Sequence, residues 1–186
     1  MQWTFETTAL AGIIVVTPPV FADERGFFQE TYNERIFHDN GIMDGFVQAN
    51  HSLSRRSGTL RGIHFQTAPE AQAKLVRCIR GRALDVAVDL RRSSPSFKSW
   101  FATELSPANR RQLYVPAGFG HAFLTLETDT EMLYSVSRLY SKPNDAVLRW
   151  NDPDIDIDWP VSPADVILSE KDAAAPFLRD APALFD

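Results

Sequence analysis

Residues 83–90 read Ala-Leu-Asp-Val-Ala-Val-Asp-Leu, and this stretch decides the fold class. Its leucines and valines fall on even positions and its two aspartates on odd positions, which is the period-two pattern of a half-buried β-strand. Ten further short apolar or alternating runs, separated by Gly, Pro, Asn, Asp and Ser, cover residues 13–16, 27–32, 46–51, 59–65, 74–79, 100–105, 113–115, 122–126, 132–137 and 146–150. So many short strands favour an all-β chain built from two packed antiparallel sheets, as in a sandwich, a jelly roll or a barrel.

Helical signals are few and short. Residues 33–40 begin with Asn and are followed by Gly41, so they predict one short capped helix. The tail from residue 162 is more helical in composition, and Ser169 followed by Glu-Lys-Asp resembles a helix start. No repeat, low-complexity tract or linker interrupts the chain, so we expect residues 1–186 to form a single domain.

Composition excludes several classes of protein. The 186 residues are 44% apolar and 23% charged, as in ordinary globular domains, and the net charge of −5 argues against a general nucleic-acid binder. The lone cysteine, Cys78, excludes a disulfide framework and fits the reducing cytoplasm, where we expect the protein. The apolar run at 9–16 is too short to span a membrane, and it follows Glu6 rather than the basic stretch of a signal peptide.

Charge is unevenly distributed along the chain. Residues 55–82 carry seven basic groups and one acid, whereas residues 145–186 carry ten acids and three bases. A concentrated basic segment in an acidic protein is what a site for a phosphorylated small molecule needs. A solvated basic face explains the same pattern, and charge alone does not separate the two.

The first chemical cluster, at residues 58–66, reads Gly-Thr-Leu-Arg-Gly-Ile-His-Phe-Gln. His64 beside an arginine can act as a base near an anion, although a strand histidine with a purely structural hydrogen bond is more common. In a regular strand Arg61 and His64 point to opposite faces. Gly62 lies between them and can host a bulge that turns one side chain to the other face.

A second histidine, His121, follows a Pro-Ala-Gly-Phe-Gly turn. In a metal-binding cupin, the ligands from these two clusters would be His64, Gln66, Glu70 and His121. An amide in place of an imidazole makes that set weak for a transition metal, so we expect no metal.

Two further residues have interior strand parity. Tyr134 shares its face with Met132 and Val136, so its hydroxyl needs a partner and can serve as a proton donor, although packing alone is the commoner role. Lys74 alternates with Val76 and Cys78, so it lies either at the exposed end of a strand or inside a cleft. Dinucleotide, phosphate-loop and serine-nucleophile motifs are missing from the sequence, which favours chemistry without a nucleotide cofactor.

Taken together, the motifs resemble the dTDP-4-dehydrorhamnose 3,5-epimerase family. The matching stretches occur in one order from near the start of the chain to near its end, at residues 20–30, 46–52, 60–66, 74–77, 85–89, 114–123, 150–152 and 171–176. The resemblance implies a cupin-like jelly roll, a cytoplasmic homodimer, no cofactor, and a dTDP-linked 4-keto-6-deoxy sugar as substrate. It implies epimerisation of dTDP-4-dehydro-6-deoxy-D-glucose at C3 and C5, through an enolate, to dTDP-4-dehydro-L-rhamnose.

The resemblance also assigns roles. It makes His64 the general base, Asp172 the carboxylate that orients it, Tyr134 the acid on the opposite sugar face and Lys74 the partner of the C4 oxygen. For Asp172 a plain helix-capping role remains open. It further implies that ten residues bind the substrate: Arg25, Glu30, Gln48, Asn50, Arg61, Lys74, His121, Tyr140, Asp145 and Lys171. Two of them, Arg25 and Glu30, are implied to reach across the dimer.

Three alternatives remain open from the sequence. One is a relative that inverts only C3 or only C5 of a nucleotide-linked 4-keto sugar. Another is a metal-dependent cupin oxygenase, and the third is a jelly roll that binds sugar nucleotides without catalysis. Neither a nucleic acid nor a membrane is an expected partner.

Overall fold

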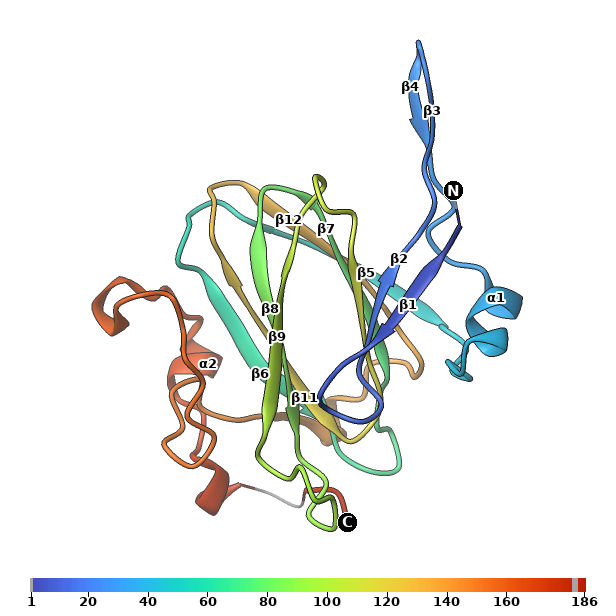
Figure 1. Cartoon of the computed structure of the whole chain (residues 1–186). Coiled ribbons are helices and arrows are strands. Elements are labelled where there is room, and N and C mark those ends of the chain that lie inside the picture. Colours follow the sequence, from blue (N-terminus) through green and yellow to red (C-terminus); the bar gives the residue numbers. More distant parts are fainter. Residues whose placement is uncertain (1, 182–183) are drawn as a thin grey trace.

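The computed structural model describes residues 2–181 and 184–186. Two antiparallel sheets pack face to face, and a separate two-stranded hairpin projects from the body of the molecule (Figure 1). One sheet has the order β1 (Thr4–Thr7), β2 (Ile14–Thr17), β10 (Gln112–Val115), β7 (Lys74–Arg80), β12 (Thr130–Val136), β5 (Gln48–Ser54). The other has the order β13 (Asp145–Val147), β6 (Leu60–Gln66), β11 (Phe119–Thr125), β8 (Ala83–Asp89), β9 (Trp100–Leu105). The expected jelly roll of two antiparallel sheets is confirmed.

Helices are short, as predicted, and most lie near the C-terminus. The chain forms α1 (Glu34–Asp39), α2 (Glu170–Ala173) and the 3-10 turns η1 (Lys142–Asn144), η2 (Pro163–Asp165) and η3 (Leu178–Asp180). The side chain of Asn33 accepts a hydrogen bond from the Ile36 amide and so caps α1. Within the described residues, no helix combines the length and the hydropathy needed to cross a bilayer.

Three apolar clusters hold the layers together. One fills the space between the sheets and includes Val76, Leu113 and Met132. A second lies on the outer side of the five-stranded sheet, which is covered by the C-terminal segment with Trp150 and Trp159. The third lies on the outer side of the six-stranded sheet beneath α1. Because both outer faces have an apolar cover, part of the space between the sheets is available for polar groups.

The strand that decides the fold differs from its prediction. Residues 83–90 form β8, but both of its faces are buried, and Asp85 and Asp89 have no exposed surface. The aspartate side faces the other sheet instead of solvent, because alternation separates apolar from polar positions without saying which medium the polar face meets. Asp89 accepts hydrogen bonds from Arg91, Ser94 and Ser96.

A bulge at Gly62 places Arg61 and His64 on the same face of β6. In the pairing of β6 with β11, His64 lies opposite His121 and Arg61 lies opposite Phe123, so β6 contains one extra residue. Leu60 and Ile63 accordingly both pack into the cluster outside the sheet, and Arg61 and His64 share the opposite, inner face. The sequence allowed such a bulge without requiring it, and the structure has one.

We predict that Gly62→Ala destabilises the fold by about 2–4 kcal/mol, because Gly62 has a φ of +122° and an added Cβ would lie 2.6 Å from the His121 carbonyl oxygen. Gly26→Ala is the matched control, since its φ is +127° but nothing lies within 4 Å of its Cβ position. Denaturant unfolding measures both free energies. Equal losses in the two variants would contradict the proposed close approach of β6 to β11.

Candidate active site

A cavity of about 350 Å³ lies where the two sheets and the C-terminal segment meet. Side chains from both sheets line it, so a molecule bound there is contacted from two sides. The lining residues are Gln48, Asn50, His64, Phe65, Gln66, Gln72, Lys74, Tyr134, Val136, Tyr140, Asp145 and Lys171. His64 belongs to the five-stranded sheet and Tyr134 to the six-stranded sheet, and the structure brings both to this one cavity.

Asp172 holds His64 from the C-terminal segment. The Nε2 of His64 donates to Asp172 Oδ1 at 2.6 Å, and Asp172 Oδ2 accepts a hydrogen bond from the Ser169 hydroxyl at 2.7 Å. Ser169 Oγ in turn accepts from the Asp172 amide, so Ser169 caps α2 and also binds the carboxylate that holds the imidazole. With Nε2 engaged, Nδ1 is the ring nitrogen that can accept a proton from a ligand.

Burial lowers the pKa of His64 below its usual 6.5, against the opposing hydrogen bond and charge of Asp172. The positive charges of Lys74 and Lys171 lower the pKa of His64 further. The imidazole is therefore neutral at pH 7, which is the state that a general base requires.

Burial has the opposite effect on the phenol of Tyr134. It raises the pKa of Tyr134 above 10, while the nearby Arg61 guanidinium lowers it in part. The hydroxyl stays protonated near neutral pH and can donate a proton. A neutral imidazole and a protonated phenol thus come from facing sheets, which is the arrangement that proton transfer across a bound molecule needs.

Lys74 lies deep in the cavity with only 7% of its surface exposed, so the cleft alternative from the sequence is the correct one. Its Nζ donates to the backbone oxygen of His64 at 3.2 Å. Burial lowers the pKa of Lys74 to about 8, against the charges of Asp85 and Asp145 that raise it. Most of the population is still cationic at pH 7.

Polar contacts organise the mouth of the cavity. Asp145 Oδ2 accepts hydrogen bonds from the Tyr140 hydroxyl and from Lys171 Nζ. Gln48 accepts from the Tyr140 amide and donates to Asn50. These contacts connect β5, β13 and α2 around the opening.

The remaining predicted site residues lie elsewhere. Arg61 is on the inner face but binds Ser54 and the Leu53 carbonyl outside the cavity lining. His121 is 6% exposed and donates to Asp85 at 2.8 Å. Arg25 lies at the tip of the hairpin, paired with Asp23, and Glu30 accepts a hydrogen bond from Asn33. The binding roles of these four residues stay predictions.

Three of the four residues that would bind a metal in the cupin alternative are hydrogen-bonded to other groups. His64 and His121 each bind a carboxylate, and the Gln66 amide binds the backbone of Glu70, Leu139 and Ser141. In residues 2–181 and 184–186, no group of three or more His, Cys, Asp or Glu is arranged to hold a metal ion.

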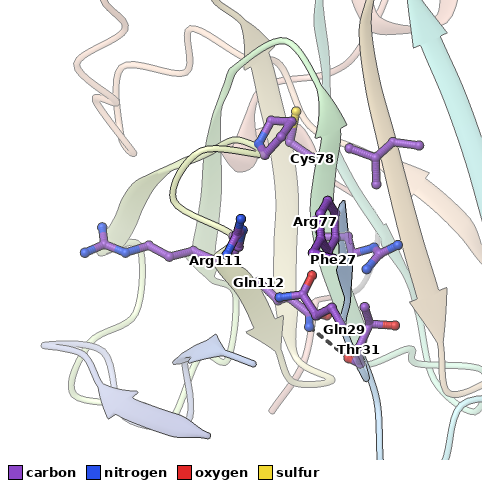
Figure 2. A pocket seen from close by; sticks show the side chains of 10 residues that line it. Phe27, Gln29, Thr31, Arg77, Cys78, Arg111 and Gln112 are labelled. Carbon is purple, nitrogen blue, oxygen red and sulfur yellow. Dashed lines mark hydrogen bonds between the residues drawn. The ribbon is translucent and has the colours of Figure 1, made fainter. Parts of the chain in front are cut away.

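A separate hollow of about 360 Å³ lies at the base of the hairpin (Figure 2). Arg77 and Gln112 reach it from β7 and β10, and Gln112 donates to the Thr31 carbonyl at 2.8 Å. None of the predicted catalytic residues lines this hollow.

Comparison with known proteins identifies the family. A sequence model of dTDP-4-dehydrorhamnose 3,5-epimerase matches residues 7–180. The chain is 47% identical over 182 residues to the dTDP-4-dehydrorhamnose 3,5-epimerase of Methanothermobacter thermautotrophicus, with 97% of each chain covered. The chain belongs to the dTDP-4-dehydrorhamnose 3,5-epimerase family.

Solved structures of this family superpose closely on the chain. A dTDP-6-deoxy-D-glucose-3,5-epimerase from Legionella pneumophila, in complex with dTDP-4-keto-L-rhamnose, has a TM-score of 0.91 and 37% identity, covering 96% of this chain and 94% of that one. A 3′-monoepimerase from Streptomyces bikiniensis, in complex with dTDP-quinovose, has a TM-score of 0.84 and 33% identity, covering 92% and 86%.

Sequence reasoning did not assign three polar residues to this cavity or its surroundings. Gln66 and Gln72 line the cavity, and Asp85 lies buried beneath it against His121. Gln66 has the same strand parity as His64, which could have indicated a shared face. Asp85 belongs to the alternating stretch 83–90, but the alternation predicts a half-buried strand whose aspartate face meets solvent.

We predict that Asp172→Asn lowers the pKa of His64 further, because Asp172 is the group that raises it. The chain has four histidines, so imidazole proton signals can be followed by NMR against pH and His64 assigned with His64→Asn. Asp180→Asn, an exposed carboxylate of the same segment, is the control. A His64 pKa that rises or stays unchanged in Asp172→Asn would refute the electrostatic account.

Proposed function

We propose that this protein catalyses epimerisation of dTDP-4-dehydro-6-deoxy-D-glucose at C3 and C5, giving dTDP-4-dehydro-L-rhamnose without a cofactor. The observation that carries the proposal is the placement of the His64–Asp172 pair and Tyr134 on facing sheets around one cavity that also contains Lys74. Inversion at carbon needs a group on each side of the sugar ring, and this cavity supplies them.

The chemistry begins at the hydrogens on C3 and C5, which are acidic because both carbons adjoin the C4 carbonyl. His64 takes the proton, and the electrons of the broken C–H bond form a double bond to C4. The π electrons of the C4 carbonyl move to its oxygen, which becomes the negatively charged oxygen of an enolate. Tyr134 then returns a proton to the same carbon from the opposite face, and the C4 carbonyl reforms. Before the second carbon reacts, His64 releases its proton to solvent and Tyr134 takes one up. The same two transfers at the second carbon then complete the double inversion, with one proton removed from the sugar and one added at each step.

Lys74 supports the enolate electrostatically. A protonated amine fixed beside the developing oxyanion stabilises it more than the neutral ketone, and one such donor lowers a barrier by about 3–4 kcal/mol. Fixed placement in a buried site strengthens the effect, since the charge does not need to be reoriented during the reaction. Gln48, Asn50, Tyr140, Asp145 and Lys171 at the mouth are proposed to bind the sugar and the nucleotide.

A second candidate is epimerisation at C3 alone. The 3′-monoepimerase of Streptomyces bikiniensis shares the fold, so the fold supports both outcomes. Tyr134 and Tyr140 both line the cavity, which is compatible with double inversion.

Hydrogen exchange with solvent tests the function. In deuterium oxide we expect the 4-keto sugar nucleotide to gain deuterium at C3 and C5, as followed by NMR with product analysis. His64→Ala should lose about 10²- to 10⁴-fold in exchange rate, and Tyr134→Phe should retain some exchange with impaired inversion. His51→Ala is the control, because this histidine is half exposed and lies outside the cavity lining.

Each outcome has one interpretation. Exchange at C3 alone would identify the monoepimerase. Tight binding without exchange would indicate a binding protein, and activity that a chelator abolishes would indicate a metal enzyme. Normal turnover by His64→Ala would remove the proposed base.

We also propose that the active unit is a cytoplasmic homodimer of single-domain chains with sites shared across the interface. The hairpin β3 (Phe21–Asp23) and β4 (Gly26–Phe28) projects from the body and carries exposed Phe27 and Phe28, 64% and 68% accessible. Exposed aromatic surface of this kind is typical of interfaces. Arg25 at the hairpin tip lies away from its own cavity, so a role at a substrate needs a second chain.

Complementation between two inactive variants checks the sharing. In a mixed dimer of Arg25→Ala and His64→Ala chains, one site keeps both native residues if Arg25 acts across the interface. Random co-assembly should then restore about one quarter of the wild-type sites. Co-expressed variants with no activity above the separate homodimers, despite mixed dimers shown by mass spectrometry, would mean that Arg25 does not act in trans.

A further inference from the structure

Asp85 is a buried carboxylate that the proposed mechanism does not use. It has no exposed surface, its Oδ1 accepts from His121 Nε2 at 2.8 Å, and its Oδ2 has no hydrogen-bond partner among the described residues. A buried carboxylate with one unbonded oxygen is destabilising unless a positive charge lies close by.

Strand order places Asp85 in a row with the catalytic pair. The strands β6, β11 and β8 are neighbours, and on their inner face His64 lies opposite His121 in the register. His121 then bonds to Asp85 on the next strand. The row runs from His64, which lines the cavity, to Asp85, which is buried outside the lining. Ala83 and Ala87 flank Asp85 on the same face of β8 with small side chains.

Lys74 faces this row from the other sheet. No carboxylate lies within 4 Å of its Nζ among residues 2–181 and 184–186, so its charge depends on groups at longer range. Asp85 is the strongest of the groups that raise the pKa of Lys74, followed by Asp145, whereas Lys171 lowers it. The other titratable groups around Lys74 are His64 and Tyr134, both of which line the cavity, and His121 behind them.

We infer that Asp85, oriented by its hydrogen bond from His121, is a positioning residue that keeps Lys74 protonated at neutral pH. The inference rests on the proposed function, in which the Lys74 cation stabilises the enolate oxygen. Asp85 itself touches no reacting atom, and it acts through the charge of Lys74. The site then contains two histidine–carboxylate pairs with different tasks: His64–Asp172 moves protons, and His121–Asp85 maintains the charge of the lysine.

NMR titration of the lysines tests the inference directly. The chain has four lysines, so ¹³Cε signals can be resolved against pH and Lys74 assigned with Lys74→Met. In the wild type we expect a Lys74 midpoint near pH 8. In Asp85→Asn the midpoint should fall by about 1 unit, which is a tenfold change in the acidity constant.

The chain supplies a matched control in Asp89→Asn. Asp89 is on the same face of the same strand and is equally buried, but it is bound by Arg91, Ser94 and Ser96. This variant removes the same charge and is expected to leave the Lys74 midpoint unchanged. Equal midpoints in Asp85→Asn and Asp89→Asn would overturn the inference.

Solvent-exchange kinetics provide the second readout. The alkaline limb of kcat should move to lower pH by the same amount in Asp85→Asn, with KM little changed, whereas a merely structural role would lower the rate at every pH. If Asp85→Asn does not fold, His121→Asn keeps the carboxylate but removes the hydrogen bond that orients it, so the Lys74 midpoint should again fall. An unchanged midpoint in His121→Asn would contradict the role of the His121–Asp85 pair. Because the NMR titration needs no substrate, an inactive protein whose Lys74 midpoint responds to Asp85 would reject the proposed function and keep this inference.

Discussion

The hydrogen bond between His64 and Asp172 is the contact on which the rest of the site depends. It joins the middle of a strand to a four-residue helix more than a hundred positions later, and it is the point where the C-terminal segment completes the cavity. The same carboxylate accepts a hydrogen bond from the hydroxyl of Ser169, the residue that caps this helix. The cap of the helix and the imidazole are therefore linked through one carboxylate, and the helix holds this carboxylate at a fixed place beside the imidazole.

Charged groups inside a β-barrel require compensation from elsewhere in the fold. This chain places a lysine, two carboxylates and two imidazoles between its sheets, where desolvation disfavours charge. Much of the apolar burial lies on the outer faces of the sheets: the C-terminal segment covers one sheet, and α1 covers part of the other. Peripheral elements thus contribute to stability, and the interior is left available for chemistry.

The two faces of the cavity carry groups with complementary protonation states. Burial lowers the pKa of the imidazole on one sheet and raises the pKa of the phenol on the other, so a single physical cause produces a neutral base and a neutral acid. The same burial brings the pKa of Lys74 close to the working pH, where nearby carboxylates determine its charge. The protonation pattern follows from the depth of these groups in the fold.

The sequence by itself determined the all-β class, most of the strands, the short capped helices and the histidine, tyrosine and lysine of the candidate site, because these depend on local periodicity and residue type. It missed β1 and β3, which are short and mostly exposed and therefore have no apolar alternation. Tertiary structure decided three other matters: the bulge that turns Arg61 and His64 to one face, the burial of both sides of β8, and the pairings of Asp172 and Asp85. Each of these depends on which distant segment packs against a residue, and local alternation carries no information about that partner.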